Sequence, residues 1–215
     1  MEKYRMGLLN EIKEIFSKDR KLFLLTNAYY FGLVIVGAII ALIFPQAQSY
    51  LLGLTTAGLN SGPLSGISGA YHSGDILYAA AVTFVTNMFM GTILEITIPS
   101  LILPIWAPIM GFIRALMWGI MLVVPVPGVL PLGRLLPHYL TLLLEGEGYV
   151  VAIFACLRQI KALLNLKSIP AEQRLNAYIG TLADNIKLLI PVAIILAVAA
   201  IYEAWEVMFF TGILK

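Results

Sequence analysis

The chain has 215 residues, of which 60% are hydrophobic and 12% are charged, and its formal net charge at pH 7 is +2. Soluble domains carry about 25% charged residues, so this composition excludes an ordinary soluble protein. The basic residues cluster beside apolar tracts, which is typical of membrane proteins and argues against a nucleic-acid partner. The single cysteine, Cys156, excludes an internal disulfide, and we expect it to pack as a small hydrophobic residue.

Long apolar tracts define the fold class. Residues 22–74 contain no Asp, Glu, Lys or Arg, and several tracts exceed the roughly 20 residues that cross a bilayer as a helix. A membrane β-barrel would show short segments of alternating polarity instead. The sequence therefore predicts an all-α, polytopic transmembrane helical bundle of about five spans, forming a single integral membrane domain over residues 1–215.

The first 21 residues predict an amphipathic helix on the cytoplasmic side, ahead of a transmembrane bundle over residues 22–215. Leu8, Ile12 and Ile15 recur at helical spacing among charged residues, which is typical of a helix that lies on a membrane surface. A solvated helical tail fits the same pattern. This charged segment is not the apolar core of a signal peptide, so we expect the spans themselves to direct insertion.

The first two spans flank a glycine-rich segment. Span one is expected at about residues 22–44. Residues 46–75 predict a short helix to about Asn60, followed by an irregular Gly/Ser segment in an interfacial or re-entrant position. Span two is expected at about residues 76–98. It carries a stripe of small and polar residues, four apart, that should face other helices rather than lipid: Ala79, Thr83, Asn87, Gly91 and Glu95.

Prolines mark the next two connections. Pro99, Pro104 and Pro108 predict a tight, kinked turn, because each proline removes a backbone donor. Span three follows at about residues 109–124, and a stiff proline-rich loop then ends at Arg134. A six-span arrangement, with the proline-marked stretch as a separate half-helix, is the main alternative.

Span four, at about residues 136–156, is apolar enough to cross a membrane, yet it carries His138, Glu145 and Glu147. Ionisable groups at membrane depth are costly, and they usually face a protein interior, a partner or water. His138 and Glu145 are seven residues apart, or about two helical turns, and therefore share a face. The other spans are expected to surround that face.

Span five is expected at about residues 186–204 and contains Glu203. Ser168 and Pro170 are typical of a helix start, and that helix can run straight into the span. Basic residues are concentrated in the N-terminal 21 residues and between residues 158 and 187, whereas the loops after spans one and three carry almost none. Cytoplasmic segments are enriched in Lys and Arg. Five spans therefore predict a cell-membrane protein with a cytoplasmic N-terminus and an outside C-terminus.

Three motifs occur in order along the spans. The first is Thr86-Asn87 in span two. The second is Leu135-Leu136-Pro137-His138 at the start of span four, with a glutamate further on. The third is the Ala-Ala-Ile-Tyr-Glu-Ala stretch at residues 199–204. In order and spacing they resemble the stage II sporulation protein M family of integral membrane proteins, from about residue 22 to the end. The resemblance implies fold and location. Members that act in endospore formation resemble membrane scaffolds that hold cell-wall hydrolases during engulfment, and many relatives occur outside spore formers.

The chain departs from the family pattern at three positions. The family typically has a glycine after the motif histidine and a glutamate four residues after it. Here those positions hold Tyr139 and Leu142, and the glutamate is Glu145. Met88 stands where the family has a second asparagine.

The polar side chains of the spans form a candidate intramembrane site. It comprises His138, Glu145, Glu203, Arg114, Asn87 and Glu95. A polar cavity that binds an ion, a headgroup or a proton is one interpretation, and a hydrogen-bonded network that fixes the bundle is the other. We expect Arg114 to pair with Glu95, Glu145 or Glu203, and Glu147 to face elsewhere, toward Arg134, Arg114 or lipid headgroups. Zinc needs three or four converging ligands, so neither a metal nor a cofactor is expected.

Gly66-Ile67-Ser68-Gly69 matches the Gly-x-Ser-Gly motif of rhomboid-type intramembrane proteases. The chemistry would need a histidine base on a facing helix, for which His138 is the candidate. The expected position of Ser68 in a glycine-rich loop argues against this interpretation.

We therefore expect a non-enzymatic membrane scaffold or assembly factor of the stage II sporulation protein M type. The alternative is a transport component in which the face of His138 and Glu145 lines a cavity. An intramembrane serine protease is the third hypothesis. The expected partners are membrane lipids and other membrane or envelope proteins. Small residues at positions 58, 62, 79, 91, 111 and 119 also suggest self-association through close helix packing.

Overall fold

The computed structural model describes residues 7–61, 65–165 and 169–213, and the regular elements in these ranges are helical. In chain order they are α1 (Leu8–Lys18), α2 (Arg20–Ile43), α3 (Pro45–Ser61), α4 (Ser65–His72), α5 (Ile76–Val85), the π-helix η1 (Thr86–Thr97), α6 (Ile98–Ile102), α7 (Trp106–Leu122), α8 (Leu132–Asn165) and α9 (Ala171–Phe210). The predicted all-α fold class is confirmed.

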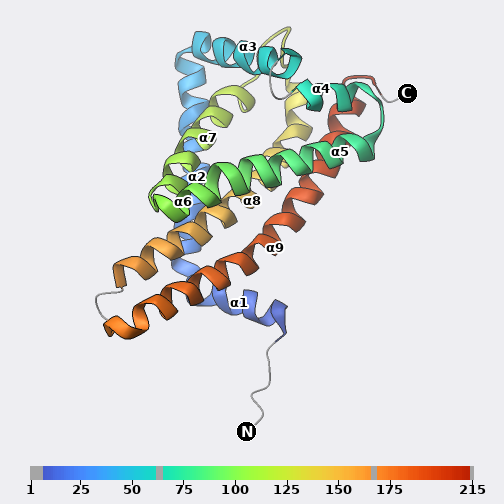
Figure 1. The fold of residues 1–215 in the computed structure, drawn as a ribbon. Coiled ribbons are helices and arrows are strands. Elements are labelled where there is room, and N and C mark those ends of the chain that lie inside the picture. The colour runs from blue at the N-terminus through green and yellow to red at the C-terminus, as the bar shows by residue number, and fades with distance from the viewer. Residues whose placement is uncertain (1–6, 62–64, 166–168, 214–215) are drawn as a thin grey trace.

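The helices form two main pairs (Figure 1). α8 and α9 make a long antiparallel pair, and α2 packs along α7. The continuous run α5–η1–α6 lies across this assembly and contacts α9. α3 lies across one end of the bundle, and α1 lies at the opposite end, close to α9 (Figure 1).

Within the described ranges, four helical segments are long and apolar enough to cross a membrane. They are Arg20–Ile43, Ile76–Ile102, Leu132–Asn165 and Ala171–Phe210. They correspond to predicted spans one, two, four and five, and they mark the chain as a membrane protein. The α9 helix runs from Pro170 into span five without a break, as expected.

Predicted span three is the shorter helix α7. Its 17 residues extend about 25 Å at 1.5 Å per residue, less than the roughly 30 Å hydrocarbon thickness. The hydroxyl of Tyr29 donates to the carbonyl of Pro108 at 2.9 Å, so α7 begins part-way along α2 rather than beside its first residue. The proline-marked turn before it, at residues 103–105, is tight, as predicted.

Two connections differ from the sequence prediction. The segment expected to be irregular after Asn60 contains the helix α4, at Ser65–His72. Gly62 and Pro63, which belong to the same expected segment, lie outside the described residues. The proline-rich loop after α7 ends earlier than expected, because α8 begins at Leu132.

The π-helix η1 is a feature that hydrophobic periodicity did not predict. It covers 12 residues, Thr86–Thr97. The Thr92 hydroxyl donates to the Asn87 carbonyl at 3.0 Å, and the Thr97 hydroxyl donates to the Thr92 carbonyl at 2.9 Å. Both bonds reach back five residues, which matches the wider π-helical turn. The predicted polar stripe still faces the protein: Ala79, Thr83 and Gly91 are buried, and Asn87 and Glu95 are partly buried.

Helix α3 covers the end of α7. The Gln48 side chain is 3% exposed, and its Nε2 donates to the carbonyls of Val124, at 2.7 Å, and Met121, at 3.4 Å. The last carbonyls of a helix have no partner within that helix, and an unpaired carbonyl is costly in an apolar setting. Gln48 therefore allows α7 to end beneath α3 with these carbonyls paired.

α2 and α7 cross with their backbones in direct contact. A Cβ atom added to Gly119 would overlap the Val34 carbonyl oxygen, and one added to Gly37 would overlap that of Leu116. Only glycine permits this approach.

The small residues offered for self-association are largely used inside the chain. Ala79 is fully buried, Gly119 contacts α2, and Gly91 and Gly111 are covered by Tyr149 and Ile153. Gly62 lies outside the described residues. At Gly58, in contrast, an added Cβ atom would have no atom within 4 Å. The expected small-residue surface for a second copy is therefore reduced to that one position among the described residues.

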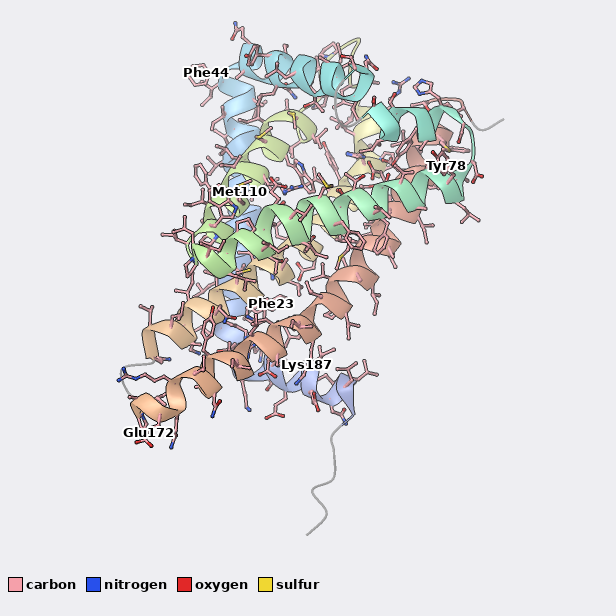
Figure 2. All side chains as sticks on the ribbon, viewed as in Figure 1. Phe23, Phe44, Tyr78, Met110, Glu172 and Lys187 are labelled. Atoms are coloured by element: carbon pink, nitrogen blue, oxygen red, sulfur yellow. The ribbon has the colours of Figure 1, made fainter. Side chains whose placement is uncertain are left out.

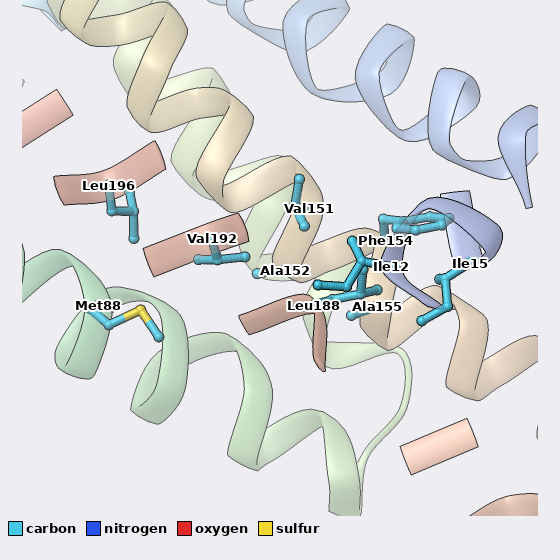
Figure 3. Packing of buried hydrophobic residues seen from close by; sticks show 10 residues of the cluster. All are labelled: Ile12, Ile15, Met88, Val151, Ala152, Phe154, Ala155, Leu188, Val192 and Leu196. Atoms are coloured by element: carbon cyan, nitrogen blue, oxygen red, sulfur yellow. The ribbon is translucent and has the colours of Figure 1, made fainter. Parts of the chain in front are cut away.

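Helix α1 is docked on the bundle. Ile12 is 8% exposed and Ile15 5% exposed, and both pack in a cluster with Phe154 and Leu188 (Figure 3). The expected amphipathic helix is thus present. However, this part of its apolar face is occupied by α8 and α9, rather than being left to lipid or solvent.

A cluster of charges, here called the charge cluster, holds the docked helix in place. Arg158 Nε lies 2.9 Å and Lys161 Nζ 2.6 Å from the Asp19 carboxylate, in the α1–α2 junction. Lys187, on the part of α9 that lies beside α1 (Figure 2), is 2.9 Å from Glu11 and 3.0 Å from Asp184. The charge cluster thereby joins α1 to both long helices.

We expect acid to weaken this attachment. Burial raises the pKa of Asp19, but hydrogen bonds from Lys161 and Arg158 outweigh burial, so the pKa lies below its ordinary value of 3.8. A lowered folded-state pKa means that the carboxylate stabilises the fold above pH 3.8, and that this stability is lost as the pH falls through the lower folded value. Charged hydrogen bonds contribute about 2 kcal/mol.

The measurement is the unfolding temperature of wild type and Asp19→Asn in detergent between about pH 7 and about pH 2, a range that brackets the loss of this stability. The wild type should unfold at a higher temperature near neutral pH, and the difference should vanish in acid. A difference that stays constant with pH would contradict the role given to the Asp19 carboxylate.

Candidate intramembrane polar site

Glu145 lies at the centre of the site, on α8. It is 8% exposed and accepts a hydrogen bond from Asn87 Nδ2, on η1, at 2.5 Å. The neighbouring glycines do not leave open space. A Cβ on Gly148 would lie 2.7 Å from the Leu196 side chain, and one on Gly146 would lie 3.0 Å from Phe31. These glycines let α8 approach α2, at Gly146, and α9, at Gly148, on either side of Glu145.

Glu203, on α9, meets Glu145. Its side chain interacts with those of Glu145 and Tyr71, and all three line the same cavity. The Tyr71 hydroxyl lies 3.1 Å from the Thr83 hydroxyl. Polar groups from α4, α5, η1, α8 and α9 therefore converge at one point.

A cavity of about 390 Å³ opens at this point, here called the carboxyl cavity. Its polar lining is Ser68, Tyr71, His72, Thr83, Asn87, Glu145 and Glu203. Ser68 and His72 lie toward the exposed side, where His72 is exposed and Ser68 half-buried, whereas Tyr71, Thr83 and Glu145 are buried. The cavity therefore runs from the surface of α4 inward to the two carboxyl groups.

His138 is not part of the carboxyl cavity, although it shares a face of α8 with Glu145. Two helical turns also separate the residues by about 10 Å along the axis. His138 Nδ1 instead lies 2.6 Å from the carboxylate of Glu206, which is 2% exposed. Together with Arg134 they line a second cavity of about 220 Å³.

Glu206 was missed by the sequence interpretation. It lies three residues after Glu203, and residues three apart share a helical face. This spacing could have identified it as a second inward-facing carboxylate of α9.

Arg114 and Glu95 form a third polar group. Their side chains make an ion pair, so of the three expected partners Glu95 is the one that binds Arg114. The guanidinium lies 4.2 Å from the ring centre of Tyr149 and 6.0 Å from that of Trp118. A cation held against aromatic faces is stabilised by the ring quadrupole. Arg114 is thus neutralised beside the carboxyl cavity rather than within its lining.

Glu147 faces α2. Its carboxylate interacts with the side chain of Asn27, rather than with Arg134 or Arg114. Glu147 faces away from the site, as expected, but it does not contact either of the two proposed arginine partners.

Ser68 lies on helix α4, not in a loop. His72 Nδ1 lies 2.7 Å from the backbone carbonyl oxygen of Ser68. His138 lines the second cavity with Glu206, while Ser68 lines the carboxyl cavity. His138 is thus paired with Glu206 in another cavity, which argues against it as the base that the serine protease hypothesis requires. Among the described residues, no group of three or more His, Cys, Asp or Glu side chains is arranged to hold a metal ion.

None of the protein-family models, curated proteins or solved structures compared with this chain matches it.

Proposed function

We propose that this protein is a membrane transport component that binds a proton or a small cation between Glu145 and Glu203. One observation carries the proposal: two carboxyl groups from different membrane-length helices converge with an asparagine amide in a cavity that reaches the surface. Intramembrane carboxylates are costly, and they commonly mark ion or proton pathways.

The charges around the cavity favour a cationic occupant. The Glu145 and Glu203 carboxyl groups are joined in the lining by amide and hydroxyl groups, which can complete a coordination shell of oxygen atoms. Arg114 is occupied by Glu95, and His138 is paired with Glu206. Neither of these basic side chains therefore neutralises the carboxyl pair by direct contact.

Proteoliposomes test this proposal. Glu145→Gln keeps the side-chain shape but removes the charge, so we expect proton or monovalent-cation flux to fall at least about tenfold, while the unfolding temperature changes little. A loss of about 1.4 kcal/mol of binding already corresponds to tenfold. Glu172→Gln, on the exposed first turn of α9, is the matched control.

Two results would count against the transport proposal. One is wild-type protein that carries no flux above empty liposomes. The other is a Glu145→Gln variant whose unfolding temperature lies well below that of wild type and below that of Glu203→Gln. The Glu145 carboxylate would then be part of a structural network.

A second candidate function is the non-enzymatic scaffold or assembly factor of the stage II sporulation protein M type. The observation that favours it is that the three family-like motifs contact one another. Asn87 binds Glu145, and the Tyr202 hydroxyl donates to the Pro137 carbonyl at 3.1 Å. The motifs thus act as one packed unit, which a scaffold would need as a rigid centre. Its partners would be membrane lipids and other envelope proteins, or a second copy. A Glu145→Gln variant that carries no flux but still binds an envelope protein as well as wild type does would support the scaffold function.

We further propose that the N-terminus is cytoplasmic and the C-terminus outside. Support comes from the basic residues of α1 and of the α8–α9 ends, which lie at the end of the bundle opposite α3 (Figure 1). Basic segments favour the cytoplasmic side. The short helix α7 does not alter this orientation. The α5–η1–α6 run and α7 form a hairpin, and a hairpin returns the chain to the side of the membrane from which it entered.

Cysteine labelling tests the orientation in a Cys156→Ala background. A cysteine at Ser61, at the end of α3, should react with an impermeant thiol reagent from outside. One at Glu172 should react only after permeabilisation. The reverse pattern would overturn the orientation.

A further inference from the structure

A separate, apolar cavity lies near the end of the bundle where α1 docks. It has a volume of about 180 Å³ and is enclosed by the end of the η1–α6 run, α8 and α9. Its walls are mostly apolar, and include Leu101, Ala152, Leu189 and Val192. Leu101 is 43% exposed, and Ile186, on the same lining, is 60% exposed. The cavity therefore lies beside the outer, lipid-facing surface of the helices.

One polar side chain of the lining lacks a partner. Gln159 is 3% exposed, and its Nε2 has no hydrogen-bond partner among the described residues. The network around it determines the amide orientation. Asn185 Nδ2 donates to the Ala155 carbonyl at 2.6 Å and to Gln159 Oε1 at 2.8 Å, while Asn185 Oδ1 accepts from Arg158. Gln159 must present its oxygen to Asn185, which leaves its NH₂ group as a free donor.

The free donor lies at the level of the charge cluster. Gln159 directly follows Arg158, which binds Asp19, and Asn185 follows Asp184, which binds Lys187. Charged side chains at the ends of spans mark the headgroup region of a membrane. The apolar walls extend from this level toward the membrane interior.

We propose that this cavity binds a membrane lipid, with a hydrocarbon chain against the apolar walls and an oxygen of the lipid's glycerol region accepting a hydrogen bond from Gln159 Nε2. That oxygen is an ester carbonyl or an ether oxygen, and both lie just below a headgroup. The site is independent of the carboxyl cavity and of the transport proposal.

A single water molecule would pair the Gln159 donor but would leave the apolar walls of the cavity unfilled. Among the described lining residues, the Thr97 hydroxyl donates to the Thr92 carbonyl, and the Ser100 hydroxyl donates to the Ile96 carbonyl. These two hydroxyls can therefore only accept from a ligand. Gln159 supplies the remaining unpaired donor. A long apolar ligand with one acceptor oxygen matches both the walls and the donor.

Cys156 provides a local reporter, because it lines the same cavity and is the single cysteine of the chain. The experiment uses the purified full chain, delipidated in detergent and titrated with a diacyl or a dialkyl-ether phosphatidylglycerol. The readouts are the rate at which a small apolar thiol reagent modifies Cys156, and lipid adducts observed by native mass spectrometry. The variants are Gln159→Leu and, as a volume-matched second form, Gln159→Met. Gln173→Leu, on the exposed start of α9, is the control.

Bound lipid should slow Cys156 modification in wild type and in Gln173→Leu. In both Gln159 variants, half-protection should need roughly five times more lipid, as expected for one lost hydrogen bond, with little change in unfolding temperature. The lipid that protects Cys156 identifies the acceptor. Protection by the diacyl lipid alone assigns the ester carbonyl, and protection by the dialkyl-ether lipid alone assigns the ether oxygen. Protection by both assigns a glycerol-region oxygen of either kind. The proposal is overturned if lipid leaves Cys156 reactivity unchanged, or if the Gln159 variants are protected as well as the control.

Discussion

Gly119→Ala should unfold the bundle more easily than any other single methyl addition at the described glycines. The new Cβ would overlap the Val34 carbonyl oxygen and would lie 2.9 Å from the Gly37 Cα. These are backbone atoms, so no side-chain rotation can relieve the contact, and α2 must move away from α7. Overpacking costs about 1–3 kcal/mol when side chains can adjust, and we expect about 3 kcal/mol or more here.

The measurement is the thermal unfolding of the purified protein in detergent, with Gly32→Ala as the matched control. Gly32 lies on α2 with no atom within 4 Å of an added Cβ. Alanine is the better helix former by about 0.5–1 kcal/mol, so the control should be neutral or slightly stabilised. Equal unfolding temperatures for the two variants would show that α2 and α7 do not depend on their backbone contact.

Arg114→Met should also be strongly destabilising, because it leaves Glu95 without its ion-pair partner. The Arg114 side chain is 17% exposed and that of Glu95 35% exposed. Breaking a buried pair by removing one partner costs about 3–5 kcal/mol. Because Glu95 is partly exposed, we expect the lower end of that range. Lost stacking of the guanidinium on Tyr149 adds to the effect.

A second substitution separates charge from packing. In Arg114→Met/Glu95→Gln the stranded carboxylate is gone, so most of the lost stability should return. The unfolding temperature of the double variant, compared with both single variants, measures the interaction between the two residues. If the double variant is as unstable as the sum of the single changes, the ion pair is not the source of the stability.

The helical membrane class and most helix positions could be predicted from hydrophobicity alone. An apolar tract of about 20 residues has few stable forms in lipid, because every backbone group must be paired within the helix. Pro99, Pro104 and Pro108 predicted the tight turn, and Pro104 lies in it, at residues 103–105, whereas Pro99 and Pro108 lie in the first turns of α6 and α7. The stripe from Ala79 to Glu95 predicted the inward face of span two. These signals are local and can be read from the chain without knowing its neighbours.

Local patterns were less informative where backbone geometry changes. Helix α4 forms in a Gly/Ser segment that composition alone predicts to be irregular, because Tyr71 and Ala70 pack against α5 and α9. The π-helical turns of η1 left no clear periodicity signal. α7 is shorter than a full span, because it begins part-way along α2, where Tyr29 binds the Pro108 carbonyl.

The partners of the polar side chains depend on tertiary structure. The sequence indicated which groups would be inward-facing at membrane depth, since such charges are rarely tolerated toward lipid. It could not assign His138 to Glu206, Arg114 to Glu95, or Glu145 to Glu203 and Asn87. Helical spacing defines a face but not its height, and His138 and Glu145 share a face yet lie about 10 Å apart along α8. Which helix meets that face at each height is decided by close packing, as at Gly148, where the missing side chain lets Leu196 of α9 approach α8.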